Sequence, residues 1–154
     1  MSGFSGNPTK IVDQQIENDG FWPELDIAEF QKGYRLPAEH LVEMLVINLT
    51  TAMTEVNRDL AKLKARWQDA GVSRVESADT TVLPERTFQA ETYKRAVYCR
   101  AKASLLPEFA SVVRRESAEN LGKEAPERKE SFLEFSQQAV RSLQGRGRIT
   151  AALL

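Results

Sequence analysis

The sequence offers one histidine, His40, and one cysteine, Cys99, for nucleophilic or metal chemistry. A Ser-His-Asp or Cys-His arrangement would have to be built on that single histidine. A metal site made of several histidines is excluded for the same reason. Glu39 and Glu43 lie close to His40, but a carboxylate-bridged di-metal site needs Glu-x-x-His pairs on two helices. We interpret these acids as solvated first-turn residues of a helix, whose positive end favours carboxylates.

Cys99 stands between Tyr98 and Arg100 in a segment with helical periodicity. A neighbouring cation can lower the pKa of a thiol and make it a nucleophile. A half-buried helix cysteine without a catalytic role is far commoner. We therefore expect no catalysis at Cys99, and a single cysteine that cannot form an intramolecular disulfide fits a reducing compartment.

Phosphate and membrane binding have little support in the sequence. No glycine-rich phosphate loop of the GxxxxGK[ST] or GxGxxG kind occurs. Arg141, Arg146 and Arg148 can touch phosphate, but basic residues at a helix end are equally ordinary. The net charge of −1 gives no bulk attraction to nucleic acid, and no apolar run reaches membrane-spanning length. The sequence thus predicts no catalytic residue, cofactor or metal, a protein that is not an enzyme, and no membrane partner.

The strongest structural signal is a helix expected from Pro37 to Gly71, about 50 Å long at roughly 1.5 Å per residue. Its apolar residues alternate in steps of four and three, which predicts one continuous seam against a partner helix. The seam consists of Val42, Val46, Leu49, Met53, Val56, Leu60, Leu63 and Trp67. A helix this long is longer than a compact domain of this size needs, which suggests an elongated, rod-like element.

Two further helices complete the expected bundle. The first runs from about Thr87 to Val112, with Pro107 expected to kink or interrupt it. The second begins at Pro126 and ends at Gly145. Its apolar face is Phe132, Phe135, Ala139 and Leu143. Residues 72–86 are polar and predict an exposed loop.

A short helix is expected near the N-terminus, because Asp26 and Glu29 have the spacing of a capping box. Gly33 should end it quickly. The chain of 154 residues, 42% hydrophobic, can bury one sizeable core. We therefore predict a mainly α fold, an antiparallel helical bundle with two long helices, a third C-terminal helix and two extended arms.

The domain boundaries follow from this pattern. Residues 1–25 form an extended N-terminal arm, 26–145 the helical bundle, and 146–154 a C-terminal docking arm. Candidate docking residues lie in both arms. They are Phe21, Trp22, Arg146, Arg148, Ile149, Leu153 and Leu154. The aromatic pair either anchors in a partner's groove or covers the protein's own core, and the apolar tail is covered either by its own bundle or by another chain.

The order of these segments resembles the head completion (head stabilisation) proteins of temperate tailed bacteriophages, the gpL-type family. The resemblance covers roughly residues 20–154, and it rests on the order of weak features rather than on a catalytic fingerprint. The features are Phe21-Trp22-Pro23-Glu24-Leu25-Asp26, Thr54-Glu55-Val56-Asn57-Arg58-Asp59-Leu60, Ala70-Gly71, Tyr93-Lys94-Arg95-Ala96-Val97, Ala101-Lys102-Ala103-Ser104-Leu105 and Leu143-Gln144-Gly145 before an apolar tail.

The resemblance implies a structural head-to-tail connector. It would bind the portal protein at its vertex after DNA packaging, stabilise the filled head and form the tail docking site. The implied partners are the portal, copies of the chain in a ring such as a dodecamer, and a tail completion or terminator protein, with packaged DNA passing through the lumen. The expected location is the virion neck, after assembly in the host cytoplasm.

Two other functions remain as alternatives. A DNA-binding regulator would need a basic recognition helix, which the net charge of −1 does not favour. A small cysteine hydrolase would depend on Cys99 and His40.

Overall fold

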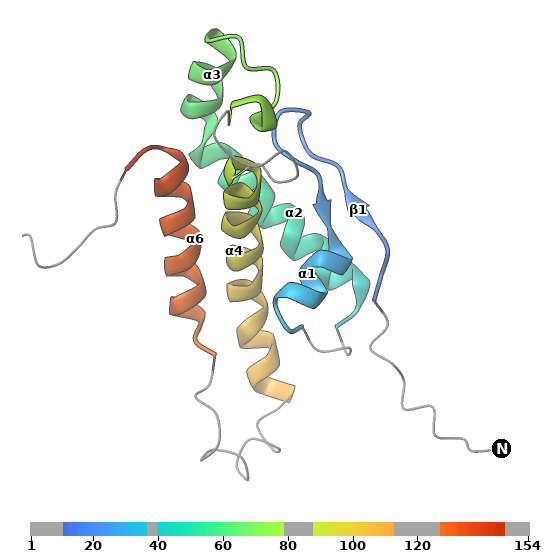
Figure 1. Cartoon of the computed structure of the whole chain (residues 1–154). Helices are drawn as coiled ribbons and strands as arrows, with labels where there is room; N and C mark the ends of the chain where they lie inside the picture. The colour runs from blue at the N-terminus through green and yellow to red at the C-terminus, as the bar shows by residue number, and fades with distance from the viewer. Residues whose placement is uncertain (1–10, 37–39, 79–87, 113–126, 147–154) are drawn as a thin grey trace, which may run out of the picture.

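The computed structural model describes residues 11–36, 40–78, 88–112 and 127–146. These residues form a mainly α fold, which confirms the predicted fold class (Figure 1). A two-stranded antiparallel sheet joins β1, Gln15–Ile16, to β2, Leu25–Asp26, and pairs Ile16 with Leu25. No helix in the described part of the chain is both long and apolar enough to cross a membrane.

Helix α1, Ile27–Gly33, follows β2 directly and agrees with the predicted short helix. Asp26 is its N-cap, and one carboxylate oxygen accepts hydrogen bonds from the backbone N–H groups of Ala28 at 2.8 Å and Glu29 at 3.4 Å. Such a cap satisfies N–H groups that have no partner inside the helix.

The single long helix predicted from Pro37 to Gly71 is wrong. The chain forms α2, Val42–Asp59, and α3, Ala61–Asp69, separated at Leu60 with φ −100° and ψ 7°. Pro37 itself lies outside the described residues. The break has a packing consequence, because α3 leaves the direction of α2 (Figure 1) and Trp67 comes within 6.0 Å of the Trp22 ring.

The α3 terminus does match the prediction. Gly71 has φ 90°, and the N–H of Val72 donates to the carbonyl of Trp67 at 2.9 Å. This is the six-to-one bond of a Schellman motif, which places glycine in the left-handed conformation after the helix.

The predicted seam is only partly correct. Six residues of α2, α3 and the link between them are buried: Leu45, Leu49, Ala52, Val56, Leu60 and Leu63. Val46 and Met53, which the four-three spacing placed in the seam, are only partly buried. In α2 the buried face is therefore turned toward Leu45 and Ala52.

Helix α4, Phe88–Val112, confirms the second long helix, and it continues through Pro107 without interruption. Helix α6, Lys129–Leu143, runs antiparallel beside it (Figure 1). Its predicted start at Pro126 lies outside the described residues, and the helix begins at Lys129. It ends as predicted before Gly145, which has φ 72°.

The buried face of α6 differs from the expected one. Its buried residues are Ser136, Ala139, Val140 and Leu143. Phe132 is half-buried and Phe135 remains 36% exposed, because both rings lie at the edge of the contact with α4.

The N-terminal segment and part of the predicted loop pack against the helices. Phe21, Trp22 and Leu25 belong to the same hydrophobic cluster as the helices, so the boundary at residue 26 does not separate two packing units. Within the predicted exposed loop, a 3-10 helix η1, Val75–Ala78, packs onto the fold. Val75 is fully buried and its N–H donates to the carbonyl of Phe21 at 3.0 Å.

Candidate functional site

The aromatic pair that sequence suggested for docking lies inside the protein. Phe21 is 2% exposed and Trp22 is 1% exposed. The Trp22 indole stacks on the Tyr93 ring of α4, with centroids 4.7 Å apart and planes 5° apart. These two side chains cover the protein's own core, which is one of the two alternatives that the sequence left open, and they present almost no exposed surface for docking.

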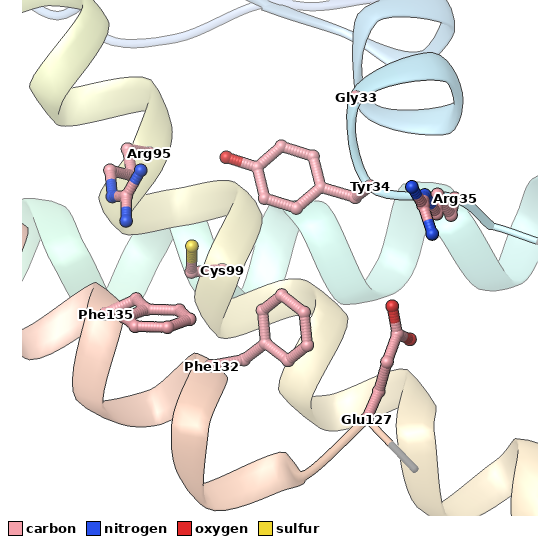
Figure 2. Close-up of a pocket in the computed structure, with 8 residues that line it drawn as sticks. All are labelled: Gly33, Tyr34, Arg35, Arg95, Cys99, Glu127, Phe132 and Phe135. Atoms are coloured by element: carbon pink, nitrogen blue, oxygen red, sulfur yellow. The ribbon is translucent and has the colours of Figure 1, made fainter. Parts of the chain in front are cut away.

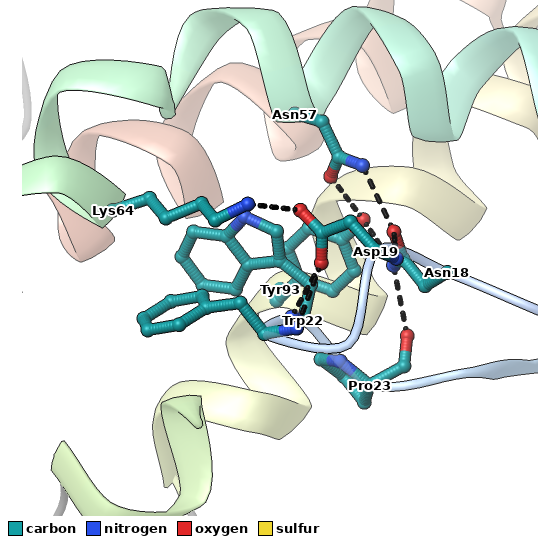
Figure 3. A network of polar contacts seen from close by, with 8 residues as sticks. Asn18, Asp19, Trp22, Pro23, Asn57, Lys64 and Tyr93 are labelled. Atoms are coloured by element: carbon teal, nitrogen blue, oxygen red, sulfur yellow. Dashed lines mark hydrogen bonds and ion pairs between the residues drawn. The ribbon is translucent and has the colours of Figure 1, made fainter. Parts of the chain in front are cut away.

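A closed cycle of hydrogen bonds lies beside Trp22 (Figure 3). Asn18 Nδ2 donates to Tyr93 Oη at 2.8 Å, Tyr93 Oη donates to Asn57 Oδ1, and Asn57 Nδ2 donates to Asn18 Oδ1 at 2.9 Å. Burial raises the pKa of Tyr93, so the hydroxyl stays protonated and able to donate. The cycle joins the N-terminal segment to α2 and α4.

Asp19 fixes the turn that carries the aromatic pair. One carboxylate oxygen accepts the N–H groups of Phe21 and Trp22 at 2.9 Å each, and the other lies 2.9 Å from Lys64 Nζ (Figure 3). Burial alone would raise the pKa of Asp19, but these hydrogen bonds outweigh it and hold the pKa below its ordinary value of 3.8.

Two cations of α4 connect other elements to the bundle. Arg100 lies 3.0 Å from Asp59 and 3.6 Å from Glu55, and its Nε donates to Ser136 Oγ at 3.3 Å. Lys102 is 1% exposed, and its Nζ donates to the Tyr34 carbonyl at 2.8 Å. All of these polar contacts hold elements together, and none leaves a reactive group facing an open site.

Lys102 also lies 2.9 Å from a carboxylate oxygen of Glu127, just before α6. A buried ammonium needs such partners, because an unpaired buried charge is strongly unfavourable. The lysine therefore joins the end of α1 to the start of α6.

Cys99 does not have the environment of a nucleophile. The side chain is buried, and burial raises the pKa of the thiol despite a hydrogen bond with Tyr34 and the nearby charge of Arg95. A protonated, covered thiol is a poor nucleophile. His40 is half-buried just before α2. Among the described residues, no group of three His, Cys, Asp or Glu side chains could hold a metal ion.

The structure contains a groove that the sequence did not predict. One hollow of about 250 Å³ lies between α1, α4 and α6 (Figure 2). It is lined by Gly33, Tyr34, Arg35, Arg95, Cys99, Glu127, Phe132 and Phe135. A second hollow of about 310 Å³ adjoins it and shares Tyr34 and Arg95 with it. Phe135, which is 36% exposed, gives the first hollow an apolar wall that is open to solvent.

Of the predicted C-terminal docking arm, residues 146–154, the structure describes Arg146 alone. Arg146 is exposed directly after Gly145. Arg148, Ile149, Leu153 and Leu154 lie outside the described residues.

Comparisons with known proteins identify the family. The profile of the phage head completion protein (GPL) family matches residues 16–154. The probable head completion/stabilization protein of Haemophilus phage HP1 (strain HP1c1) is 32% identical over 151 residues, which covers 98% of this chain and 99% of that protein. No solved structure matches the chain. Both matches extend over the N-terminal segment, the helices and the C-terminal residues together, so the chain belongs to the phage head completion protein (GPL) family.

Proposed function

We propose that this protein is a structural head-to-tail connector, which binds the portal vertex after DNA packaging, stabilises the filled head and forms the tail docking site. The observation that carries the proposal is the extent of the family match, from residue 16 to residue 154. A match of this length includes the polar cycle around Trp22, the groove and the C-terminal arm, rather than one shared helix.

The geometry supports a role without catalysis. The one cysteine has a covered thiol with a raised pKa, and the buried polar groups of the described residues connect segments of the chain. Leu41 and Ile47 are 64% and 63% exposed at the N-terminal end of α2. They offer apolar area for contacts between copies in a ring around the DNA channel.

The C-terminal arm, residues 146–154, is the part of the chain that we assign to docking on the portal or on a neighbouring copy. Gly145 follows α6 in the left-handed conformation, so the helix does not continue into Arg146. Arg146 and Arg148 supply charge, and Ile149, Leu153 and Leu154 supply apolar area. Burial of one such side chain stabilises by about 1.5 to 3 kcal/mol.

Purified heads provide the test of the proposal. DNA-filled heads assembled without this protein should bind the added chain, retain their DNA against nuclease and then accept tails. Empty proheads should bind it much less. Equal binding to both kinds of head would contradict the proposed timing, and no binding to either would contradict the connector role.

A deletion tests the docking arm within the same assay. Removal of residues 149–154 should leave the melting temperature nearly unchanged and abolish retention on filled heads. A matched control replaces Thr150, Ala151 and Ala152 with serine, which leaves all three large apolar side chains in place. Unfolding of the deletion variant would assign the arm to its own core, and normal binding would remove its docking role.

A further inference from the structure

The groove between α1, α4 and α6 has an aromatic wall and a positively charged rim. Figure 2 shows Phe132 and Phe135 of α6 facing Tyr34, with Arg95 at one end of the hollow and Arg35 at the other end, near Glu127. The Arg95 guanidinium lies 5.4 Å from the centre of the Phe135 ring, a distance suited to a cation–π contact. That contact holds the guanidinium in place without neutralising its charge.

The charges around the first hollow do not balance. Within the described part of the chain, neither Arg35 nor Arg95 forms an ion pair. The one carboxylate of the lining, Glu127, is already engaged by Lys102 at 2.9 Å. Three cations therefore face one anion, and two positive charges are left for a ligand to meet.

The backbone at Arg35 supplies a second, independent observation. Arg35 has φ 49°, and it is the one non-glycine residue with positive φ among the described residues. It follows α1 at the position that glycine occupies after α3 and α6, at Gly71 and Gly145. In each case the next N–H donates back to the helix, here from Leu36 to the Gln31 carbonyl at 3.4 Å.

A side chain at such a position is unfavourable, and glycine avoids the cost. The backbone at Arg35 is therefore strained, although the Arg35 side chain is exposed on the rim of the groove and does not pack in the core. Strain of this kind concentrates at sites that bind. The geometry therefore favours a role for the Arg35 guanidinium that the fold itself does not require.

The size and composition of the groove select the ligand class. Each hollow lies at or just below the lower end of the volume range of small-molecule sites, near 300 Å³. The first hollow, of about 250 Å³, suits a single large side chain. Duplex DNA would bring several phosphates near Glu29 and Glu91, which line the adjoining hollow. These two acids share Lys94, at 3.4 Å and 3.9 Å, so that end of the groove does not attract polyanions.

We propose that this groove binds an acidic peptide segment of a partner protein, with an apolar side chain between Phe132, Phe135 and Tyr34 and carboxylates on Arg35 and Arg95. Arginine suits this role because its planar guanidinium can bind a carboxylate through two hydrogen bonds. The inference goes beyond the proposed function, because its test needs only the isolated protein and its residues are not those of the C-terminal arm.

Fluorescence anisotropy with a labelled peptide, Gly-Glu-Leu-Phe-Asp-Gly, tests the proposal on the full chain. The same peptide with Gln and Asn in place of the acids should bind about tenfold more weakly, as expected for the loss of a charge-assisted hydrogen bond. Arg35→Gly should weaken binding of the acidic peptide by about tenfold without lowering the melting temperature, because glycine suits the positive φ. Arg95→Gln should weaken it similarly.

Arg66→Gln is the matched control, since it removes the same charge from an exposed residue of α3 and should not change the affinity. Circular dichroism confirms folding of each variant, and Arg95→Gln remains informative if Arg35→Gly unfolds. The proposal would be overturned if the two peptides bound equally well or if neither peptide bound. It would also be overturned if both groove variants bound the acidic peptide as well as the unchanged protein does. The proposal would also be overturned if a short DNA duplex displaced the peptide and bound the same two variants more weakly.

Discussion

The N-terminal segment, residues 11–36, and helix α6 both pack against α4, but they use different kinds of side chain. The N-terminal segment stacks large rings on α4: Trp22 on Tyr93 at 4.7 Å, and Phe30 on Tyr98 at 5.3 Å. Helix α6 brings a small residue, Ser136, against the α4 backbone.

The Ser136 hydroxyl is fully buried and donates to the Ala96 carbonyl at 2.7 Å, so the two helices approach closely there. An interface of large interlocking rings is destabilised when side-chain volume is removed, whereas a close approach of small residues is destabilised when volume is added. The comparison teaches that one helix supports two interfaces with opposite sensitivities. Mutations can test it directly.

The largest effect should come from Trp22→Ala. Loss of this fully buried ring leaves a cavity beside Tyr93 and should lower the free energy of unfolding by about 3 to 5 kcal/mol. Urea denaturation followed by circular dichroism measures the change. Phe135→Ala is the matched aromatic truncation on α6, and its cost should be less than half as large because the Phe135 ring is 36% exposed. Similar costs for the two variants would break the comparison.

Ser136→Leu should have the next largest effect. The added side chain has no room beside Ala96 and should destabilise the protein by about 1 to 3 kcal/mol through overpacking. Ser136→Ala removes only the hydroxyl, including its contact with Arg100, and should cost about 1 kcal/mol. If leucine were tolerated as well as alanine, the close approach of α4 and α6 would be wrong.

Tyr93→Phe separates the polar cycle from the stacked rings. The ring can still stack on Trp22, but the amides of Asn18 and Asn57 lose their shared partner, at a cost of about 1 to 3 kcal/mol. A double-mutant cycle with Asn57→Ala should show strong coupling, since both residues act in one network. Additive costs would show that the cycle does not act as a unit.

The smallest effect should be a pH dependence from Asp19. Its pKa in the folded protein lies below the ordinary value of 3.8, so its contribution to stability is present above that pH and is lost as the pH falls through the folded pKa. Asp19→Asn should therefore destabilise the protein at pH 7, and the difference should shrink progressively as the pH falls below 3.8. Thermal melts of both proteins across this range measure it, and a constant difference would contradict the assignment.

Much of the helical framework could be predicted from local signals. The Asp26 cap, the glycines after α3 and α6, and the periodicity of α4 are encoded by neighbouring residues. The break at Leu60 could not be predicted, because a four-three apolar spacing continues unchanged across a change in helix direction. The direction is set by packing partners distant in the sequence, such as Trp22 against Trp67.

The site was harder to predict than the fold. The sequence of an aromatic pair is the same whether the pair binds in a partner's groove or packs in its own core. For Trp22, the stacking on Tyr93 in the folded protein shows that it packs in the core. The groove combines Arg35, Arg95 and Phe132 from three helical regions, with no motif linking them. One local signal was available: an arginine, rather than a glycine, follows Gly33-Tyr34 at the end of α1.

The long sequence separation of the polar cycle has a consequence for synthesis on the ribosome. Asn18 and Tyr93 are 75 residues apart, and Asp26 and Tyr98 are 72 apart. At about 5 to 20 residues per second, the N-terminal segment waits roughly 4 to 15 s for α4 to be translated. During that time Trp22 lacks Tyr93, the ring that stacks on it in the folded protein. A nascent chain shorter than about 90 residues thus presents an uncovered aromatic pair, and truncated products of this length will be the ones that chaperones bind and that aggregate.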